Sequence, residues 1–275
     1  DVQKDRIEVD VWAWGRGLES WLVDHIVIDG GPEHAGTWGE LSGCLSRTWM
    51  HASGSHLGLA RLAIDTGYES PAVHAWARRA GFAIVAPVKG VEGFSRASPV
   101  AGPTYVDATD GGKRLRRGAR LWTVAVSTFK AETYRYLRLD RPTDEERAGG
   151  AAFPAGTVHL PSWADSEWCK QFVAEQLVTV KTKRGFSRLE WQKLRERNEA
   201  LDCRVYARAA AWIAGADRWP DTKWRDLERQ LAGPGVTADR EDQTAPERAA
   251  LPAAGLVRRA PSTKGRRVFR SSYMG

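Results

Sequence analysis

Four acidic residues have types and positions that could support joint chemistry, although they are far apart in the chain. Asp1 lies in the opening extended segment, and Asp65 stands between a short apolar run and a Thr-Gly pair. Glu199 and Asp202 lie at the start of a long helical pattern, three residues apart, so they share one side of that helix. Functional groups commonly lie where the strands of an α/β sheet end.

Carboxylates that are brought together repel each other and raise each other's pKa unless a cation neutralises them. Two divalent ions about 3.5–4 Å apart would neutralise them. Ligands that are all oxygen atoms favour Mg²⁺ or Mn²⁺ over Zn²⁺. Such a metal pair can activate water, clamp a phosphate and stabilise a leaving 3′ oxygen. If the fold gathers the four acids, they indicate a two-metal site for phosphodiester hydrolysis.

Each acid also has a purely structural interpretation. Glu199 and Asp202 would complement the partial positive charge of a helix N-terminus. Asp65, before Thr-Gly, is suited to a cap or a turn. Asp1 carries no information on its own. Spacing alone therefore leaves both interpretations open.

Periodicity predicts the elements that must position the first two acids. Residues 6–14 alternate between apolar and polar types, and residues 20–28 are rich in β-branched side chains. The Gly-containing break between them favours an antiparallel hairpin. Residues 1–3 fit the end of an earlier strand, which gives three antiparallel strands in series. If the first and fourth strands are neighbours, Asp1 and Asp65 lie side by side.

The next segment alternates between helix and strand patterns. We expect a helix over 37–50, a strand over 59–64, a helix that begins near Pro71 and a strand over 82–88. Strand, helix and strand with short connections form a βαβ unit, in which the strands are parallel. The predicted class is therefore α/β, with a mixed sheet of three antiparallel strands and then parallel strands, flanked by helices.

The rest of the chain divides into a structured part and a tail. We expect a hairpin or long loop over 91–120, strands over 121–127 and 158–161, a polar connection over 142–154, and helices over 129–139, 166–180 and 198–214. After Gly233 periodicity is lost, and residues 258–270 carry Lys and Arg without any acid. These patterns predict one domain over residues 1–232 and a basic, disordered tail over 233–275.

Composition excludes several classes of protein. The chain has 275 residues, 42% of them hydrophobic, and 41 Lys and Arg against 34 Asp and Glu. The resulting net charge of +7 permits a polyanionic partner. Three separated cysteines argue against a disulfide scaffold or structural zinc and fit a reducing compartment. The sequence has no HExxH, no GxSxG and no apolar run long enough for a transmembrane helix.

Several blocks of sequence resemble the nuclease domain of phage terminase large subunits, in the lambda GpA-like family. The resemblance extends from residue 1 to about residue 215, and the agreement of the blocks in order and spacing is more specific than any single motif. The blocks are Asp1-Val2-Gln3 with residues 6–23, residues 63–68, Pro87-Val88-Lys89-Gly90, Val158-His159-Leu160-Pro161 and Arg197-Asn198-Glu199-Ala200-Leu201-Asp202-Cys203.

This resemblance implies an RNase H-like fold, which agrees with the strand and helix order derived above. It also implies a metal-dependent endonuclease that cuts concatemeric double-stranded DNA during viral packaging. By position, Asp1 corresponds to the catalytic aspartate of the first strand and Asp65 to the second acid. Glu199, with Asp202 beside it, corresponds to the C-terminal acid. We retain all four as catalytic and Mg²⁺ or Mn²⁺ ligands, and prefer Glu199 over Asp202.

Basic residues supply candidate DNA contacts. Clustered cations are rewarded by counterion release regardless of base sequence, which points to Lys113, Arg114, Arg116 and Arg117 in the 113–120 segment. The resemblance adds Lys89, after the fifth strand, and Lys130, although Ser127-Thr128-Phe129 departs from the family pattern there. The alternative for each residue is an ordinary solvated side chain.

The resemblance also implies partners beyond DNA: an ATPase motor domain, a small terminase subunit and a portal protein, in the host cell cytoplasm and not at a membrane. The chain has no GxxxxGK[ST], so we expect the motor to lie upstream and this chain to be a C-terminal fragment or the product of a split gene. Two other interpretations stay open. One is a resolvase- or integrase-type RNase H-like nuclease, and the other is a non-catalytic DNA- or portal-binding module.

Overall fold

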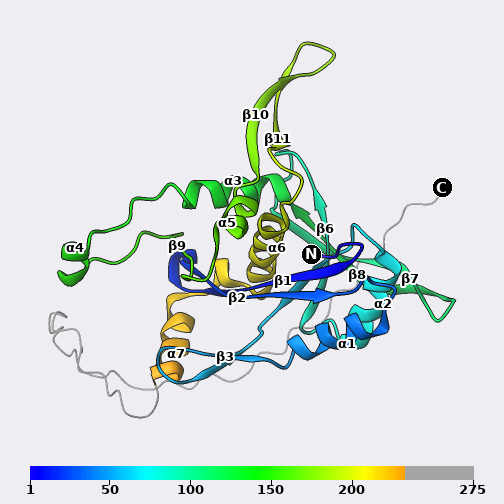
Figure 1. Cartoon of the computed structure of the whole chain (residues 1–275), viewed down its shortest axis with the longest axis horizontal. Coiled ribbons are helices and arrows are strands. Elements are labelled where there is room, and N and C mark those ends of the chain that lie inside the picture. The colour runs from blue at the N-terminus through cyan, green and yellow to red at the C-terminus, as the bar shows by residue number, and fades with distance from the viewer. Residues whose placement is uncertain (233–275) are drawn as a thin grey trace, which may run out of the picture. The chain divides into compact units, whose positions relative to one another are not determined.

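The computed structural model describes residues 1–232, which form a mixed α/β domain (Figure 1). The predicted basic tail over 233–275 lies outside the described residues. Among the described residues, no helix is long and apolar enough to span a membrane. The three cysteines are free. The predicted α/β class is confirmed, while several element boundaries differ.

The chain opens with the predicted antiparallel hairpin. Strand β1 (Arg6–Trp14) pairs with β2 (Ser20–Asp29), and the helical turn η1 (Arg16–Leu18) connects them. Val2 forms an antiparallel bridge with Ile7, so residues 1–3 extend along β1 as expected. The short strand β9 (Val158–His159) adds in parallel to the other side of β2. β2 buries one face, through Ser20, Leu22 and Ile28, whereas β1 also buries Glu8 and Trp12 on its second face.

The parallel strands form a second sheet with the order β5-β6-β8-β7. Strands β5 (Leu62–Asp65), β6 (Val85–Val91) and β8 (Lys113–Ala125) run parallel. Strand β7 (Val100–Asp110) joins β8 as an antiparallel hairpin. The βαβ prediction is confirmed, with α2 (Ser70–Ala80) as the crossover helix.

The single mixed sheet that the sequence predicted is divided in the structure. β1 and β2 belong to one hydrogen-bonded sheet and β5 to another, so the first and fourth strands are not paired as ladder neighbours. The two sheets nevertheless share a core, because Val2, Ile7 and Ile64 pack in one apolar cluster with α2. Shared packing rather than a continuous ladder therefore brings the two strand ends together.

The predicted helix over 37–50 is too long. Helix α1 (Ala35–Cys44) ends early, and a small hairpin of β3 (Thr48–Met50) and β4 (His56–Gly58) follows. Trp49 is fixed there because its indole donates to Asp24 Oδ2 at 3.0 Å. A β-branched and an aromatic residue at 48 and 49 favour a strand over a third helical turn.

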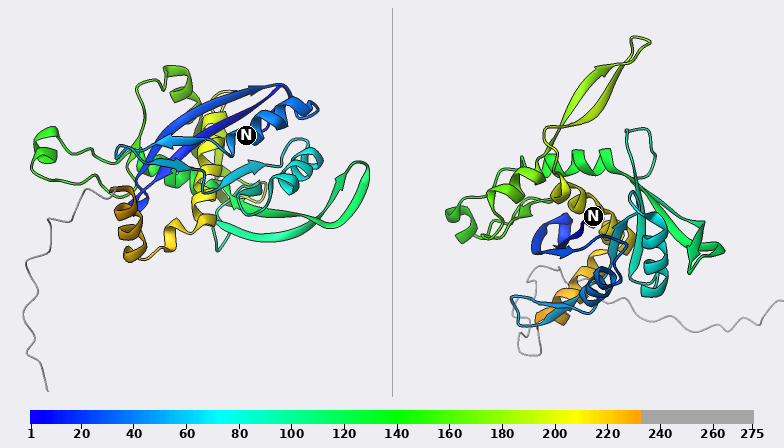
Figure 2. Two further views of the ribbon diagram at one scale, coloured as in Figure 1. Left: turned by 90° about the horizontal axis from the view of Figure 1, so that it is seen from below. Right: turned by 45° about the vertical axis from the view of Figure 1, so that its right-hand side comes forward.

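The predicted helix over 166–180 is wrong in its second half. Helix α5 (Ser166–Phe172) is short, and β10 (Glu175–Lys181) pairs with β11 (Ser187–Lys193) as an antiparallel hairpin. The hairpin projects from the rest of the domain (Figures 1 and 2). The consecutive residues Leu177, Val178, Thr179 and Val180 fit a strand as well as a helix, because short apolar runs of this length are ambiguous.

The helices over the remaining segments complete the domain. Helix α3 (Val126–Tyr136) follows β8 directly, α4 (Asp144–Ala148) lies within the polar connection, and α6 (Glu199–Ala214) matches its prediction closely. The turn η2 (Ala216–Arg218) is followed by helix α7 (Asp221–Ala232), which the sequence pattern did not predict. Arg16 holds it through Glu228 at 2.6 Å. Trp219 and Trp224 pack together with ring centroids 5.0 Å apart.

Helix α6 forms a core with both sheets. Val205 and Ala209 are buried in one cluster with Val88 of β6 and Phe129 of α3. The N-terminal part of α6 reaches β1, where the Cys203 thiol contacts the Glu8 carbonyl at 3.4 Å. Because α6 touches both sheets, the acids near its start lie between the ends of β1 and β5.

Candidate active site

Asp65 is positioned by the end of a parallel strand. It is the last residue of β5 and pairs in register with Val88 of β6. It shares a sheet face with Ala63, which packs against the α6 core, so alternation points Asp65 towards α6. Its Oδ2 accepts a hydrogen bond from the Gly67 amide at 3.0 Å. The carboxylate is partly exposed, so it can reach a bound partner.

The acids at the start of α6 lie on two adjacent stripes of the helix. Asp202 and Tyr206 are one helical turn apart, and Glu199 and Cys203 are one turn apart on the neighbouring stripe. Cys203 faces β1, as its contact with the Glu8 carbonyl shows. Tyr206 faces the other sheet. Its hydroxyl lies so close to Gly90 of β6 that a Cβ atom at that glycine would be only 2.9 Å away.

Asp65 and Asp202 converge on Tyr206. Burial, together with the neighbouring carboxylates of Asp65 and Asp202, raises the pKa of the Tyr206 hydroxyl well above its ordinary value. Burial also raises the pKa of Asp202 to about 6, and the carboxylate of Glu175 adds to this effect. Two acids distant in sequence therefore meet in a desolvated corner between α6 and the end of β5.

Asp202 is held by an amide rather than by a cation. Asn198 Nδ2 donates to Asp202 Oδ2 at 3.0 Å, and the same amide donates to Glu175 Oε1 at 3.0 Å. Lys193 Nζ in turn donates to Asn198 Oδ1 at 2.8 Å. Across residues 1–232, none of the ion pairs includes Asp202. The carboxylate thus has a fixed orientation and no direct ion pair, while Lys130 and Lys193 lie near enough to oppose part of the rise in its pKa.

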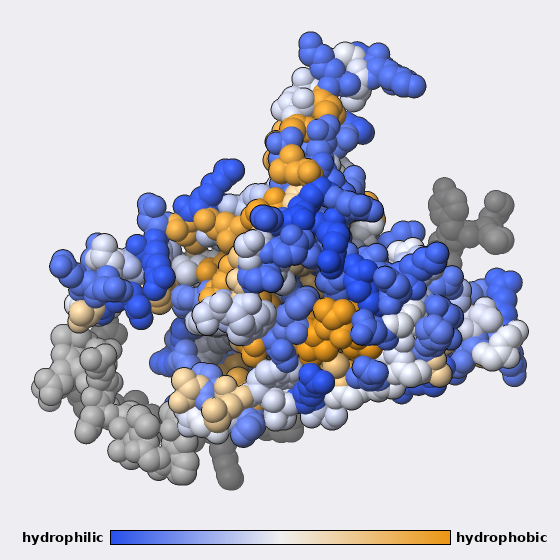
Figure 3. Space-filling view, viewed as in Figure 1, coloured by the Kyte–Doolittle hydropathy of each residue, from blue (hydrophilic) through white to orange (hydrophobic). Residues whose placement is uncertain are grey.

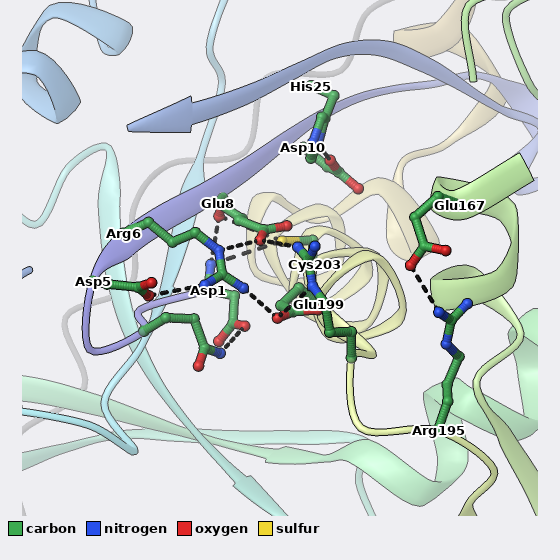
Figure 4. Close-up of polar contacts among 12 residues, drawn as sticks. Asp1, Asp5, Arg6, Glu8, Asp10, His25, Glu167, Arg195, Glu199 and Cys203 are labelled. Atoms are coloured by element: carbon green, nitrogen blue, oxygen red, sulfur yellow. Dashed lines mark hydrogen bonds and ion pairs between the residues drawn. The ribbon is translucent and has the colours of Figure 1, made fainter. Parts of the chain in front are cut away.

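Glu199 lies in a different environment. Its Oε1 accepts from Arg6 at 2.5 Å and from Arg197 at 3.4 Å, and both guanidinium groups also reach Glu8, at 2.6 and 2.9 Å. Figure 4 shows Arg6 between the carboxylates of Glu8 and Glu199. Glu8 is 2% exposed and Glu199 is 6% exposed. This network of two acids and two arginines fastens α6 to β1.

Asp1 lies between the network and Asp65. Its carbonyl accepts from the Glu8 amide at 2.9 Å, and its carboxylate accepts from Gln3 Nε2 at 2.6 Å. Burial acts to lower the pKa of the Asp1 amino group. The nearby Cys203 and Asp65 side chains have the opposite effect and prevail, so the pKa of the amino group is raised. The structure therefore brings Asp1, Asp65 and Asp202 to one corner, with Glu199 on the neighbouring helix stripe.

The donor set fits a hard divalent cation in its chemistry. Asp202 is a desolvated carboxylate with no paired cation, and Asp65 offers a second carboxylate beside it. Within residues 1–232, however, no three His, Cys, Asp or Glu side chains are close enough to form a ready-made metal group. In both Asp65 and Asp1, the internal hydrogen bonds from the Gly67 amide and from Gln3 Nε2 engage only Oδ2, so Oδ1 is left to face a cation.

Lys130 is not a surface side chain. It is 5% exposed, and its Nζ donates to both oxygens of Glu175, at 2.8 and 2.7 Å. Its expected contact with a DNA phosphate is not possible in this arrangement, because the buried carboxylate already occupies the ammonium group. Lys130 lies beside Asp202 and partly opposes the rise in the pKa of that acid.

The other candidate DNA contacts are exposed. Lys89 is exposed on β6, and alternation places it on the sheet face opposite Gly90 and Tyr206. The basic segment is the tip of the β7–β8 hairpin, which fits the predicted hairpin. Arg114 is paired with Asp107 at 2.7 Å, and the amide of Arg117 and this guanidinium lower the pKa of Asp107. Among the described residues no ion pair neutralises the remaining tip cations, Lys113, Arg116 and Arg117.

Several residues that shape the site were missed by the sequence reading. Glu8 lies on the polar side of an alternating strand, and only the structure shows that it is fully buried. Asn198 lies within the last resembling block, and Tyr206 follows that block by three residues. Glu175 had no signal in the sequence, because its role depends on contacts with segments far away in the chain.

The structure is thus an α/β domain in which carboxylates gather beside the end of a parallel strand, and this group of acids is its candidate active site. A family model described as "Terminase large subunit gpA, endonuclease domain" matches residues 1–224. The chain belongs to this family. The match covers all the acids discussed above.

Two curated relatives agree with this assignment. The "Terminase, large subunit" of Escherichia phage lambda is 32% identical over 220 residues, which are 80% of this chain and 32% of that protein. The protein of the same description from Enterobacteria phage P21 is 33% identical over 221 residues, with the same coverage of 80% and 32%. The chain thus spans about a third of the length of these relatives. No solved structure matches it.

Proposed function

We propose that this chain is a metal-dependent DNA endonuclease domain that cuts concatemeric double-stranded viral DNA during packaging. The observation that carries the proposal is the convergence of Asp65 and Asp202 on Tyr206, within a chain of the terminase endonuclease family. The proposed fold type is RNase H-like, in which acids from the central strands and the last helix meet.

In this proposal Asp65 and Asp202 hold Mg²⁺ or Mn²⁺, and Asp1 is the third acid. The bound metal pair would supply Lewis acidity for phosphodiester hydrolysis with a 3′ oxygen as leaving group. The chain's own residues prepare the site. Asn198 orients the Asp202 carboxylate, and the Tyr206 hydroxyl lies close to both Asp202 and Asp65. A divalent cation would reverse the raised pKa of Asp202 and relieve the cost of its burial.

Glu199 has a positioning role in this account. Its Oε1 is engaged by Arg6 and Arg197, which link it to the buried Glu8, while its Oε2 is buried without a hydrogen-bond partner among the described residues. Moving the carboxylate towards a metal would cost both arginines their contact with Oε1. We therefore assign the C-terminal acid to Asp202 in preference to Glu199.

Surface cations hold the duplex in this proposal, and the larger assembly supplies the other partners. Lys89, Lys113, Arg116 and Arg117 are exposed and suited to phosphate contacts. An ATPase motor domain, a small terminase subunit and a portal protein are the proposed partners of the whole terminase in the host cell cytoplasm.

We expect the purified chain to convert supercoiled plasmid to nicked and linear forms in Mn²⁺ or Mg²⁺, and to lose that activity in EDTA. Agarose gels with time points measure the rate. A matched linear and branched substrate pair tests the class of nuclease, since preference for branched DNA would indicate a resolvase. Metal-independent DNA binding without any cleavage would contradict the proposal and indicate a binding module.

A further inference from the structure

The β10–β11 hairpin touches the acid site only at its base, through Glu175 and Lys193, and projects away from the domain (Figure 1). Each strand has seven residues. At about 3.4 Å per residue, such an arm extends over 20 Å. Among residues 1–232, its strands pair with each other and with no other strand, as a two-stranded sheet. An isolated hairpin of this kind is marginally stable in water, so its length calls for a bound partner.

Exposed cations gather on the outer part of this arm. Lys181, Lys183 and Arg184 are exposed, and no ion pair within the described residues includes them. Arg188 is also exposed, but it is paired with Glu190. Figure 3 shows the hydrophilic end of the hairpin together with apolar side chains along its length. The charge pattern fits a polyanion rather than a basic or apolar surface.

The turn adds a large exposed aromatic ring among the cations. Phe186 is 71% exposed, and Leu189, three residues further along on β11, is 50% exposed. The aromatic face suits stacking on a base or contact with a sugar, while the neighbouring cations suit phosphates. A two-stranded ribbon also has dimensions that the major groove of duplex DNA admits.

The base of the arm is anchored next to Asp202 by hydrogen bonds. The Glu175 carboxylate receives Lys130, and its backbone carbonyl accepts from the Tyr134 hydroxyl at 2.5 Å. Lys193, which lies opposite Glu175 in the ladder, donates to Asn198, the residue that holds Asp202. A duplex that the arm grips is therefore held in a fixed relation to the acid corner.

We propose that the β10–β11 hairpin is a DNA-binding arm that grips duplex phosphates through Lys181, Lys183 and Arg184 and presents the duplex to the acid corner. This inference rests on the proposed nuclease function and specifies its DNA interface. It differs from the contacts expected at the β7–β8 tip, because the β10–β11 arm is anchored to the residues that orient Asp202.

The test compares duplex binding by wild type and Lys183→Ala/Arg184→Ala in EDTA, by fluorescence anisotropy across a salt series. The matched control is Arg47→Ala/Arg78→Ala, which removes two exposed cations far from the hairpin in sequence. Arg47 follows helix α1, and Arg78 lies on helix α2. Each lost phosphate contact lowers the salt slope by about 0.9 and the affinity near 0.1 M salt by about eightfold. We expect a slope smaller by about 1.8 and a loss of up to about sixtyfold for the arm variant, and little change for the control.

Cleavage assays of the same proteins separate the two proposals. Suppose that the wild type cleaves DNA and that the arm variant has the same DNA affinity and salt slope as the control variant. That result would overturn the proposal of a DNA-binding arm and indicate a protein partner for the hairpin. A wild type that neither binds nor cleaves DNA would overturn the nuclease proposal and the arm together. Circular dichroism checks that the arm variant keeps its fold, which the exposure of both side chains favours.

Discussion

Asp202→Asn is expected to lower the rate of metal-dependent plasmid cleavage by about a hundredfold or more, the usual scale for losing one charge-stabilising group. The substitution keeps the size of the side chain and a polar contact with Asn198, so the fold should persist. It removes the carboxylate that lies with Asp65 beside Tyr206. Single-turnover cleavage in Mn²⁺ measures the effect.

Glu199→Gln is the matched comparison on the adjacent helix stripe. It is expected to retain most of the cleavage activity but to lose about 2 kcal/mol of unfolding free energy, because Arg6 and Arg197 lose a charged acceptor. Urea denaturation measures the stability of both variants. If Glu199→Gln abolished cleavage while Asp202→Asn cleaved normally, the assignment of the C-terminal acid would be reversed.

Lys130→Met is expected to destabilise the domain by about 3–5 kcal/mol, because it leaves the Glu175 carboxylate buried without its cation. Lys130 and Glu175 have side chains that are only 7% and 3% exposed, so solvent cannot replace the lost partner. The change should appear in chemical denaturation as a lower midpoint with an unchanged slope.

The double variant Lys130→Met/Glu175→Leu tests whether the loss of stability comes from leaving the Glu175 carboxylate unpaired. Replacing both members by apolar groups should recover much of the lost stability, since no charge is then left unpaired. Lys89→Met, at an exposed position, should change stability by less than about 0.5 kcal/mol. A stable Lys130→Met variant with a selective loss of DNA affinity would restore Lys130 as a phosphate contact.

Sequence periodicity predicted the elements whose burial follows a simple rule. β1, β2 and α2 each have one apolar face, and α6 carries a stripe with Leu201, Val205 and Ala209. Such elements are set by their own residues. The positions of Asp65 at a strand end and of the acids at the start of α6 followed directly from these elements.

Features that depend on distant partners were not predictable in this way. The apolar run after Phe172 fits helix and strand alike, and only its ladder with β11 makes it a hairpin. Lys130 is buried because Glu175, which is 45 residues away, lies opposite it. Glu199 and Asp202 share a helix start in sequence. Arg6, which is 193 residues from Glu199, separates their environments.

The division of the predicted sheet has a similar cause. The sequence pattern establishes which segments are extended, but hydrogen bonding between distant segments determines which of them form one ladder. Val2 pairs with β1 and packs in the core that β5 shares, without joining the two ladders. The acid corner survives this division because packing of α6 against both sheets, rather than strand pairing, determines its position.

The central claim is that Asp65 belongs to the metal-dependent reaction centre, and one cleavage assay tests it most directly. Supercoiled plasmid in Mn²⁺ is incubated with wild type, Asp65→Ala and Asp29→Ala. The last variant removes an exposed carboxylate at the end of another strand. We predict a loss of about a thousandfold for Asp65→Ala and wild-type rates for Asp29→Ala. Plasmid nicking by Asp65→Ala at the wild-type rate would contradict the account.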